Sequence, residues 1–176
     1  MPFPRTSLAW GNKVSPVFRE RIFWIADELD IDPNYLMACI AWESGETFKS
    51  NVKNAAGSGA TGLIQFMPST ARSLGTTVQK LAAMTPEDQL NYVYKYFKPY
   101  KGRLKTLGDL YMAILWPKGI GQAESWTLWD KSMGKLFKQN AGIDINSDGR
   151  ITKAEATAKV QAKLVKGMST KLRWVA

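Results

Sequence analysis

The chain has 176 residues and a net charge of +9, with 45% hydrophobic and 22% charged residues, a composition typical of one globular domain. Histidine is absent, so Ser-His-Asp and Cys-His catalysis and zinc sites with imidazole ligands are excluded, and acid–base chemistry falls to Asp, Glu, Lys, Tyr or water. No apolar run reaches the 18 residues of a membrane span, residues 1–14 lack the pattern of a secretory signal, and the single Cys39 has no disulfide partner in the chain.

Helices are expected along most of the chain, because few segments show the two-residue alternation of strands. Residues 1–14 are expected to form an irregular arm. Capping residues, early prolines and apolar periodicity predict helices over residues 15–30, 32–44, 68–75, 85–100, 106–116, 125–140 and 153–172. Residues 45–61 and 141–150 are rich in turn-forming residues and are expected to be loops. We therefore predict a mainly α fold in a single domain over residues 1–176.

The run "ACIAWESGETF", residues 38–48, ends an apolar helix on a carboxylate. Leu36, Ile40 and Glu43 fall on one face of that helix. Burial and the negative end of the helix dipole both disfavour the charged carboxylate, and could raise the pKa of Glu43 from ~4.3 toward ~6. Glu43 is therefore a candidate general acid, and an ordinary exposed glutamate at a helix end is the alternative.

Two motifs carry a family resemblance. "ESG" at residues 43–45, a loop, and then "GATGLIQFMPSTA" at residues 59–71 resemble the E-S-G … G-L-M-Q-x-M-P-x-T-A pattern of the soluble lytic transglycosylases and goose-type lysozymes. The variant here looks most like the phage endolysins and virion-associated murein hydrolases of that group. The resemblance implies a lysozyme-like fold and cleavage of the β-1,4 bond between N-acetylmuramic acid (MurNAc) and N-acetylglucosamine (GlcNAc) in peptidoglycan.

The resemblance also assigns roles to single residues. Glu43 matches the catalytic glutamate that protonates the glycosidic oxygen. The residues that match substrate-contacting positions of the motifs are Ser44, Thr61, Gln65 and Met67. The family often carries a downstream A-Y-N motif whose tyrosine faces the catalytic glutamate. The corresponding stretch here, "DLYMAILWPKGIG" at residues 109–121, has no Tyr-Asn pair, so Tyr92 or Tyr111 supplies that hydroxyl or neither does.

The number of acids separates two reactions. Hydrolysis with retention or inversion usually needs two carboxylates, whereas a lytic transglycosylase manages with one and gives a 1,6-anhydroMurNAc product. Candidate second acids are Glu46, Asp109 and Glu124. The residues around each of them indicate a catalytic acid less specifically than those around Glu43. We favour the transglycosylase, with a hydrolysing muramidase as the alternative. A calcium-stabilised wall-binding module without catalysis is an alternative of another class.

The stretch "DINSDGRITKAE", residues 144–155, fits the calcium-binding loop of an EF-hand position by position. The predicted ligands are Asp144, Asn146, Asp148, the carbonyl of Arg150, and Glu155. We expect one structural Ca²⁺ within an EF-hand-like loop and basic C-terminal helix over residues 141–176, and no cofactor for catalysis. A metal-free turn leading into a helix is the alternative.

Positive charge gathers in residues 98–138, with eight Lys or Arg against three acids, and in residues 150–176, with seven against one. We expect the partner to be peptidoglycan, with the basic C-terminal helix facing the anionic cell envelope, although a solvated basic face that aids solubility is the alternative. No signature favours nucleic acid, and we expect a monomer. Without a signal, such an enzyme is expected to stay in the host cytoplasm until it is released to the periplasm and cell wall, or to travel in the virion.

Overall fold

The computed structural model describes residues 2–176. Within them the fold is mainly helical, as predicted. The α-helices are α1 (Pro16–Leu29), α2 (Pro33–Glu43), α3 (Pro68–Ser73), α4 (Val78–Ala83), α5 (Pro86–Phe97), α6 (Leu107–Leu115), α7 (Lys135–Asn140) and α8 (Lys153–Gly167). The short strands are β1 (Ser7–Leu8), β2 (Thr127–Asp130), β3 (Arg150–Thr152) and β4 (Trp174–Val175), and they form the antiparallel pairs β1–β4 and β2–β3. No helix within residues 2–176 is long and apolar enough to cross a bilayer.

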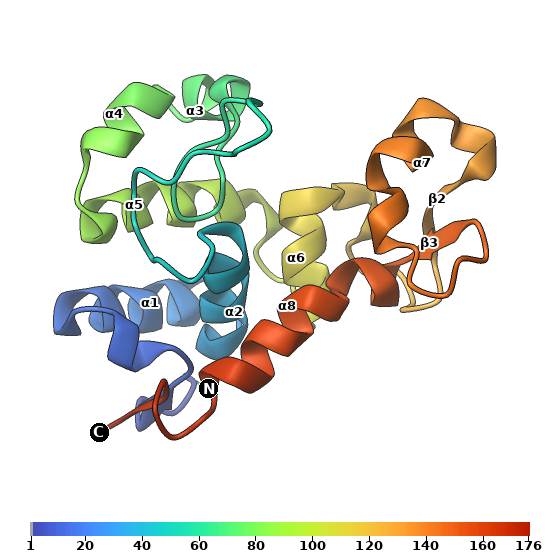
Figure 1. Cartoon of the computed structure of the whole chain (residues 1–176). Coiled ribbons are helices and arrows are strands. Elements are labelled where there is room, and N and C mark those ends of the chain that lie inside the picture. Colours follow the sequence, from blue (N-terminus) through green and yellow to red (C-terminus); the bar gives the residue numbers. More distant parts are fainter. Residues whose placement is uncertain (1) are drawn as a thin grey trace.

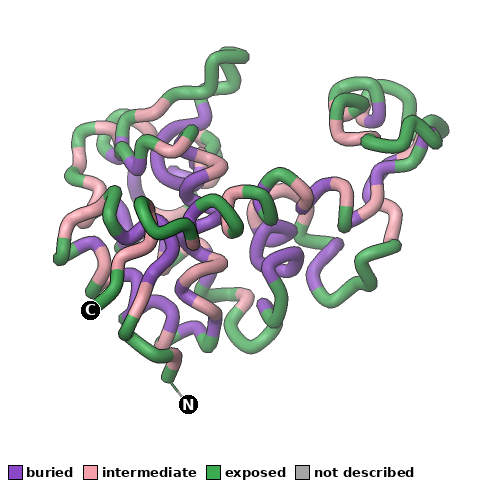
Figure 2. Tube along the Cα trace, turned by 60° about the horizontal axis from the view of Figure 1, so that its bottom comes forward, coloured by how far each residue is buried: buried purple, intermediate pink, exposed green. Residues whose placement is uncertain are grey.

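Helix α2 lies at the centre of the fold, and α1, α6 and α8 pack directly against it (Figure 1). Six consecutive residues, Leu36–Ala41, are completely buried. A helix can be buried on every side only if it is apolar all round, as this stretch is. Figure 2 shows buried backbone concentrated around the central helices, whereas the outlying part that contains α7 is mostly exposed.

The predicted helix starts are confirmed where a capping side chain precedes a proline. The Ser15 hydroxyl accepts the N–H of Phe18 at the start of α1, and the Thr85 hydroxyl accepts the N–H of Asp88 at the start of α5. These side chains satisfy backbone donors that have no partner inside the helix. The local sequence is therefore sufficient to place these ends.

The N-terminal arm is not irregular throughout, as was expected for residues 1–14. Strand β1 pairs with β4, so the two ends of the chain lie side by side. Trp10 is 1% exposed, and its indole N–H donates to the Lys163 carbonyl at 2.9 Å. A Cβ at Gly167 would lie 2.2 Å from the Trp10 ring. Helix α8 ends at Gly167, five residues before the expected end, where Trp10 packs against it. Met1, the first residue of the expected arm, lies outside the described residues.

The helix predicted over residues 125–140 is also wrong in its first half. Thr127–Asp130 form β2, which pairs with β3 and places Trp129 opposite Ile151. Both side chains are buried. Tryptophan, threonine and isoleucine favour strands when a partner strand is present, and this long-range pairing overrides the local apolar spacing. Helix α4 was not predicted at all.

Candidate active site

Glu43 is the last residue of α2, directly after the buried run Leu36–Ala41. The N–H of Ser44 still bonds to the Ile40 carbonyl at 2.9 Å, and Gly45 then turns the chain with φ of +60°. Left-handed backbone of this kind favours glycine. The chain therefore leaves the helix immediately after the carboxyl.

Burial raises the pKa of Glu43 to about 7. An apolar environment disfavours the charged form, and this is the direction that the sequence predicted. None of the ion pairs formed within residues 2–176 includes Glu43. Near neutral pH about half of the Glu43 side chains are therefore protonated. This suits a group that must give and then take a proton.

Two tyrosines lie near this carboxyl. The pKa of Tyr111 is raised by burial and then by the charge of Glu43, and the pKa of Tyr96 is raised by burial, then by Tyr100 and by Glu43. The charge of Glu43 therefore acts on both phenols. Tyr96 comes from α5 and Tyr111 from α6.

The two phenols differ in what their hydroxyl groups can still do. The Tyr96 hydroxyl donates to the Ala113 carbonyl at 2.5 Å, so its remaining capacity is to accept. The Tyr111 hydroxyl accepts the Trp42 indole N–H at 3.1 Å, so its own hydrogen can be donated to a carboxylate or a sugar. The Lys159 ammonium lies 5.4 Å from the centre of the Trp42 ring. Helix α8 thus contacts this tryptophan from outside the site.

The turn at residues 61–67 supplies one wall of a small pocket. Thr61 and Phe66 exchange two backbone hydrogen bonds of 3.0 and 2.9 Å. The side-chain amide of Gln65 donates to the carbonyls of Val52 and Gly62 at 3.1 and 3.0 Å. The pocket has a volume of about 60 Å³, and its lining residues are Ile64, Gln65, Phe66, Met67, Thr70, Tyr96 and Ile114. Tyr96, whose pKa is raised in part by the charge of Glu43, therefore belongs to the lining of this pocket.

Gln89 holds this turn, and the sequence analysis did not identify it. Its side chain is completely buried; its oxygen accepts the Leu63 N–H at 2.8 Å, and its nitrogen donates to the Ser50 and Leu81 carbonyls, each at 2.9 Å. A Cβ at Gly62 would lie 2.4 Å from the Gln89 oxygen. The available signal was a glutamine four residues before Val93, on the apolar stripe of α5.

The structure brings together only some of the predicted substrate-contacting residues. Gln65 and Met67 line the pocket and Tyr111 lies near Glu43. Ser44 and Thr61 are buried.

Their hydroxyls are engaged within the chain: that of Ser44 accepts the Phe48 N–H, and that of Thr61 donates to the Gly59 carbonyl. Tyr92 lies one helical turn before Tyr96, with the Lys95 ammonium 4.9 Å from its ring centre. The tyrosine of α5 whose pKa is affected by the charge of Glu43 is Tyr96, which the sequence analysis did not identify as a site residue.

Two of the three candidate second acids, Asp109 and Glu46, are bound to lysines. The Asp109 carboxylate lies 2.6 Å from the Lys153 ammonium, both groups are buried, and it also accepts the Gly121 N–H at 2.8 Å. The carboxylate of Glu124 is exposed and lies beside Gly108, next to Lys153.

Glu46 is bound by two lysines of α8, Lys163 and Lys166. These lysines, and Lys159 over Trp42, were expected to face an anionic envelope, yet all three contact residues of the chain. Fewer cations of α8 are therefore free to contact the envelope in the predicted way.

The EF-hand-like loop, residues 144–155, contains β3 and ends in the first turn of α8. Gly149 has φ of +82°, and Glu155 lies in the first turn of α8, where it accepts the N–H groups of Thr152 and Ile145. The Asp144 carboxylate accepts the N–H groups of Asp148 and Gly149. Asn146 accepts from Asp148, and Asp148 from Arg150.

The side chains therefore provide the oxygen ligands that Ca²⁺ takes, but these oxygens accept bonds from the loop itself. Across residues 2–176, no three His, Cys, Asp or Glu side chains are gathered in the manner of a metal site.

Comparison with known proteins supports the resemblance found in the sequence. Residues 21–126 match the family model described as "Transglycosylase SLT domain". A protein of Enterobacteria phage PRD1 named "Transglycosylase" is 29% identical over 134 residues, which cover 76% of this chain and 46% of that protein. The chain therefore spans about half the length of this relative. The family match includes Glu43, the pocket turn and both tyrosines, and it ends before β2.

The environments of Glu43 and Glu46 predict opposite effects of neutral substitution on stability. Because the pKa of Glu43 is raised from 4.5 to about 7, this group stabilises the fold while it holds its proton, and that contribution is lost as the pH rises through about 7. Glu43→Gln should be more stable than the wild type at pH 8, by up to about 3 kcal/mol at ~1.36 kcal/mol per pKa unit. It should match the wild type at pH 4. Urea denaturation at both pH values measures this.

Glu46→Gln is the matched control. Hydrogen bonds from Lys163 and Lys166 lower the pKa of Glu46, so its contribution is present above the unfolded pKa and is lost as the pH falls through the folded one. This variant should be less stable than the wild type at pH 8. Equal stability of Glu43→Gln and wild type at that pH would contradict a buried acid at position 43.

Proposed function

Since the family model matches more than half of its residues, the chain belongs to the SLT transglycosylase domain family, and on that premise we propose that it is a lytic transglycosylase of the phage endolysin type. Its substrate is the MurNAc-β-1,4-GlcNAc bond of peptidoglycan. The observation that carries this proposal is one largely buried carboxyl, Glu43, with a pKa of about 7, whose charge acts on Tyr111 and on Tyr96, a lining residue of the pocket.

The proposed reaction uses Glu43 twice. The neutral carboxyl donates its proton to the glycosidic oxygen as the bond from that oxygen to C1 of MurNAc breaks, which releases GlcNAc with a 4-hydroxyl group. The N-acetyl oxygen of MurNAc stabilises the positive charge at C1. The carboxylate then takes the proton of the C6 hydroxyl as O6 bonds to C1, giving 1,6-anhydroMurNAc and restoring the neutral acid.

The surroundings of Glu43 support a reaction with one acid. Hydrolysis with retention needs a second carboxylate at ~5–5.5 Å and inversion needs one at ~6.5–9.5 Å. Glu46 and Asp109 are each bound to lysine ammonium groups, and Glu124 lies beside Gly108. The anhydro ring needs no second carboxylate, because the attacking hydroxyl belongs to the substrate.

The remaining residues are assigned supporting roles in this proposal. After the first proton transfer, the Tyr111 hydroxyl donates a hydrogen bond to the Glu43 carboxylate. The Gln65 nitrogen is engaged by Val52 and Gly62, so its amide oxygen is the part that accepts a bond from a sugar. Met67, which is 44% exposed, provides an apolar contact at the pocket mouth. Ser44 and Gln89 position the acid and the turn.

Replacing Glu43 by Gln removes the proton donor and leaves the shape of the site nearly unchanged. We expect sugar release from purified peptidoglycan to fall by roughly 10²–10⁴-fold, the usual contribution of general acid–base catalysis. Mass spectrometry of the wild-type products should give 1,6-anhydroMurNAc ends.

Glu124→Gln changes an exposed carboxyl outside the site and should keep wild-type activity. Reducing MurNAc ends would identify a hydrolysing muramidase instead. Equal absence of sugar release from wild type and Glu43→Gln, with both still bound to the wall, would identify a binding module.

We also propose that the loop at residues 144–155 binds one Ca²⁺. The ligands would be Asp144, Asn146, Asp148, the Arg150 carbonyl and Glu155, whose oxygens would have to exchange their loop hydrogen bonds for the ion. Such an ion would fix the start of α8, and it takes no part in the proposed bond cleavage.

Calcium should then raise the thermal stability of the protein. At a free Ca²⁺ concentration about 100 times the dissociation constant, we expect a rise in melting temperature of roughly 5–10 °C, measured by circular dichroism. Asp144→Asn should abolish this rise, whereas Asp130→Asn, outside the loop, should preserve it. The same melting temperature with calcium and with chelator would contradict the site.

A further inference from the structure

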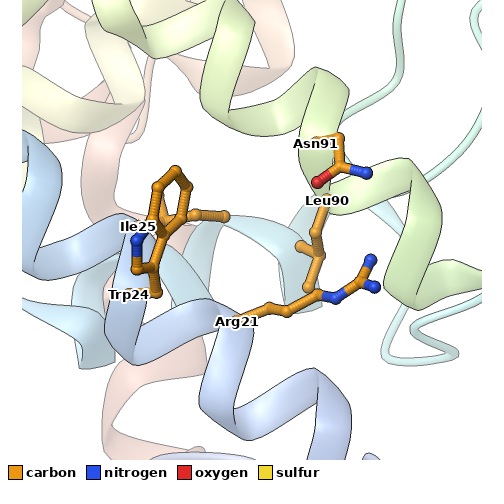
Figure 3. A pocket seen from close by; sticks show the side chains of 5 residues that line it. All are labelled: Arg21, Trp24, Ile25, Leu90 and Asn91. Atoms are coloured by element: carbon orange, nitrogen blue, oxygen red, sulfur yellow. The ribbon is translucent and has the colours of Figure 1, made fainter.

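The outer surfaces of α1 and α5 form a groove that the proposed reaction does not use. Two hollows of about 270 and 330 Å³ lie side by side there and share Arg21 and Trp24. In Figure 3 Trp24 borders the first hollow on one side, Arg21 lies below it, and Leu90 and Asn91 reach into it from α5. The second hollow is lined by α1 alone; its exposed surface is mostly apolar, and Glu20 lies in it between Val17 and Trp24. We call the two hollows together the Trp24 groove.

Trp24 presents an aromatic surface to solvent. Its side chain is 47% exposed although it lies next to the buried Ile25. Tyr94 of α5 packs against its ring, with the ring centres 4.8 Å apart. A large aromatic ring is expensive to leave in water, and this one is held in place by a neighbour while part of its surface stays uncovered. Val17, 55% exposed and two turns earlier on the same face, continues the apolar surface.

Polar groups border this aromatic surface. Asn91 is exposed beside Leu90 and offers an amide. Arg21 donates to the Glu87 carbonyl at 2.5 Å and lies 3.3 Å from Asp88, in a solvent-exposed pair of the kind that contributes little stability. The Lys98 ammonium lies 5.8 Å from the centre of the Tyr94 ring. The groove therefore combines an aromatic platform, an amide and the Arg21 guanidinium with one acidic residue, Glu20, and the Lys98 ammonium lies outside the lining, beside Tyr94.

We propose that the Trp24 groove binds a second stretch of the peptidoglycan glycan strand, outside the catalytic site. The apolar C–H face of a pyranose ring packs on Trp24, the acetamido and hydroxyl groups bond to Asn91, and the carboxylates of the lactyl group or stem peptide pair with Arg21 and Lys98. This rests on the proposed function, because it takes the same polymer as ligand. A strand held here stays on the enzyme between successive cuts.

The size of the groove favours a sugar chain over a protein partner. Two adjoining hollows of about 300 Å³ suit single sugar rings in sequence, whereas a stable protein interface buries roughly 800 Å² on each side.

Binding to insoluble peptidoglycan in a catalytically silent background tests the proposal. In the Glu43→Gln protein, at about 0.15 M salt where long-range charge effects are screened, sedimentation with purified peptidoglycan gives a dissociation constant. Adding Trp24→Ala should weaken binding about tenfold, and Trp24→Phe should restore most of it because an aromatic face remains. Val165→Ala, which removes an exposed apolar side chain of α8, should leave binding unchanged.

Asn91→Ala provides a second variant that does not depend on the stability of the Trp24 change, because Asn91 is exposed. It should weaken binding several-fold. Unchanged binding by both Trp24→Ala and Asn91→Ala would overturn the proposal, as would the same loss with Val165→Ala. A wild type that releases no sugar but binds through Trp24 refutes the proposed function alone, and sugar release with unchanged binding by the variants refutes this inference alone.

Discussion

The carboxyl of Glu43 lies at the end of α2, a helix whose residues Leu36–Ala41 are completely buried. The helices packed around α2 keep this carboxyl away from water and from cations. Helices α1, α6 and α8 pack on α2, and the charge of Glu43 acts on Tyr96 of α5 and Tyr111 of α6. A buried carboxyl destabilises the fold whenever it ionises. The large apolar core around α2 offsets this cost and keeps the acid neutral near pH 7.

The segment that follows the family match supports this arrangement from outside. At the start of α8, the buried Lys153 ammonium binds Asp109 and so joins α8 to α6. Further along, Lys163 and Lys166 bind Glu46, three residues after the acid. Breaking the buried Lys153–Asp109 pair would leave an uncompensated charge, so this pair fixes the position of α8 strongly, whereas the pairs of Glu46 are partly exposed. The basic C-terminal helix is thus part of the framework that holds α2.

Local signals in the sequence were sufficient for the helices that carry the site. Ser15 and Thr85, each followed by proline, mark helix starts that the structure reproduces, and the apolar run before Glu43 predicted both its burial and the direction of its pKa shift. These features depend on residues that are neighbours in the chain. Residues 127–130 form a strand only because residues 150–152 pair with them.

Gln89, Tyr96 and Lys153 show what local reasoning cannot supply. Each looks like an ordinary residue of a helix, and its role depends on partners 8 to 44 residues away in the chain, such as Leu63 for Gln89 and Asp109 for Lys153. The motif that suggested Tyr92 or Tyr111 could not locate the α5 tyrosine, because the register of α5 against α2 is set by packing. The loop at residues 144–155 matched its pattern fully, yet a pattern does not show whether the oxygens gather around an ion.

A site-resolved titration of the Glu43 side chain tests the central claim most directly. Carbon-13 NMR of labelled glutamate carboxyls, recorded between pH 3 and 9 as in any such titration, should show one resonance with a midpoint near pH 7, and that resonance should be missing in Glu43→Gln. If the resonance assigned to Glu43 instead titrates near the ordinary glutamate value of 4.5, the carboxyl is solvated and position 43 does not hold a general acid.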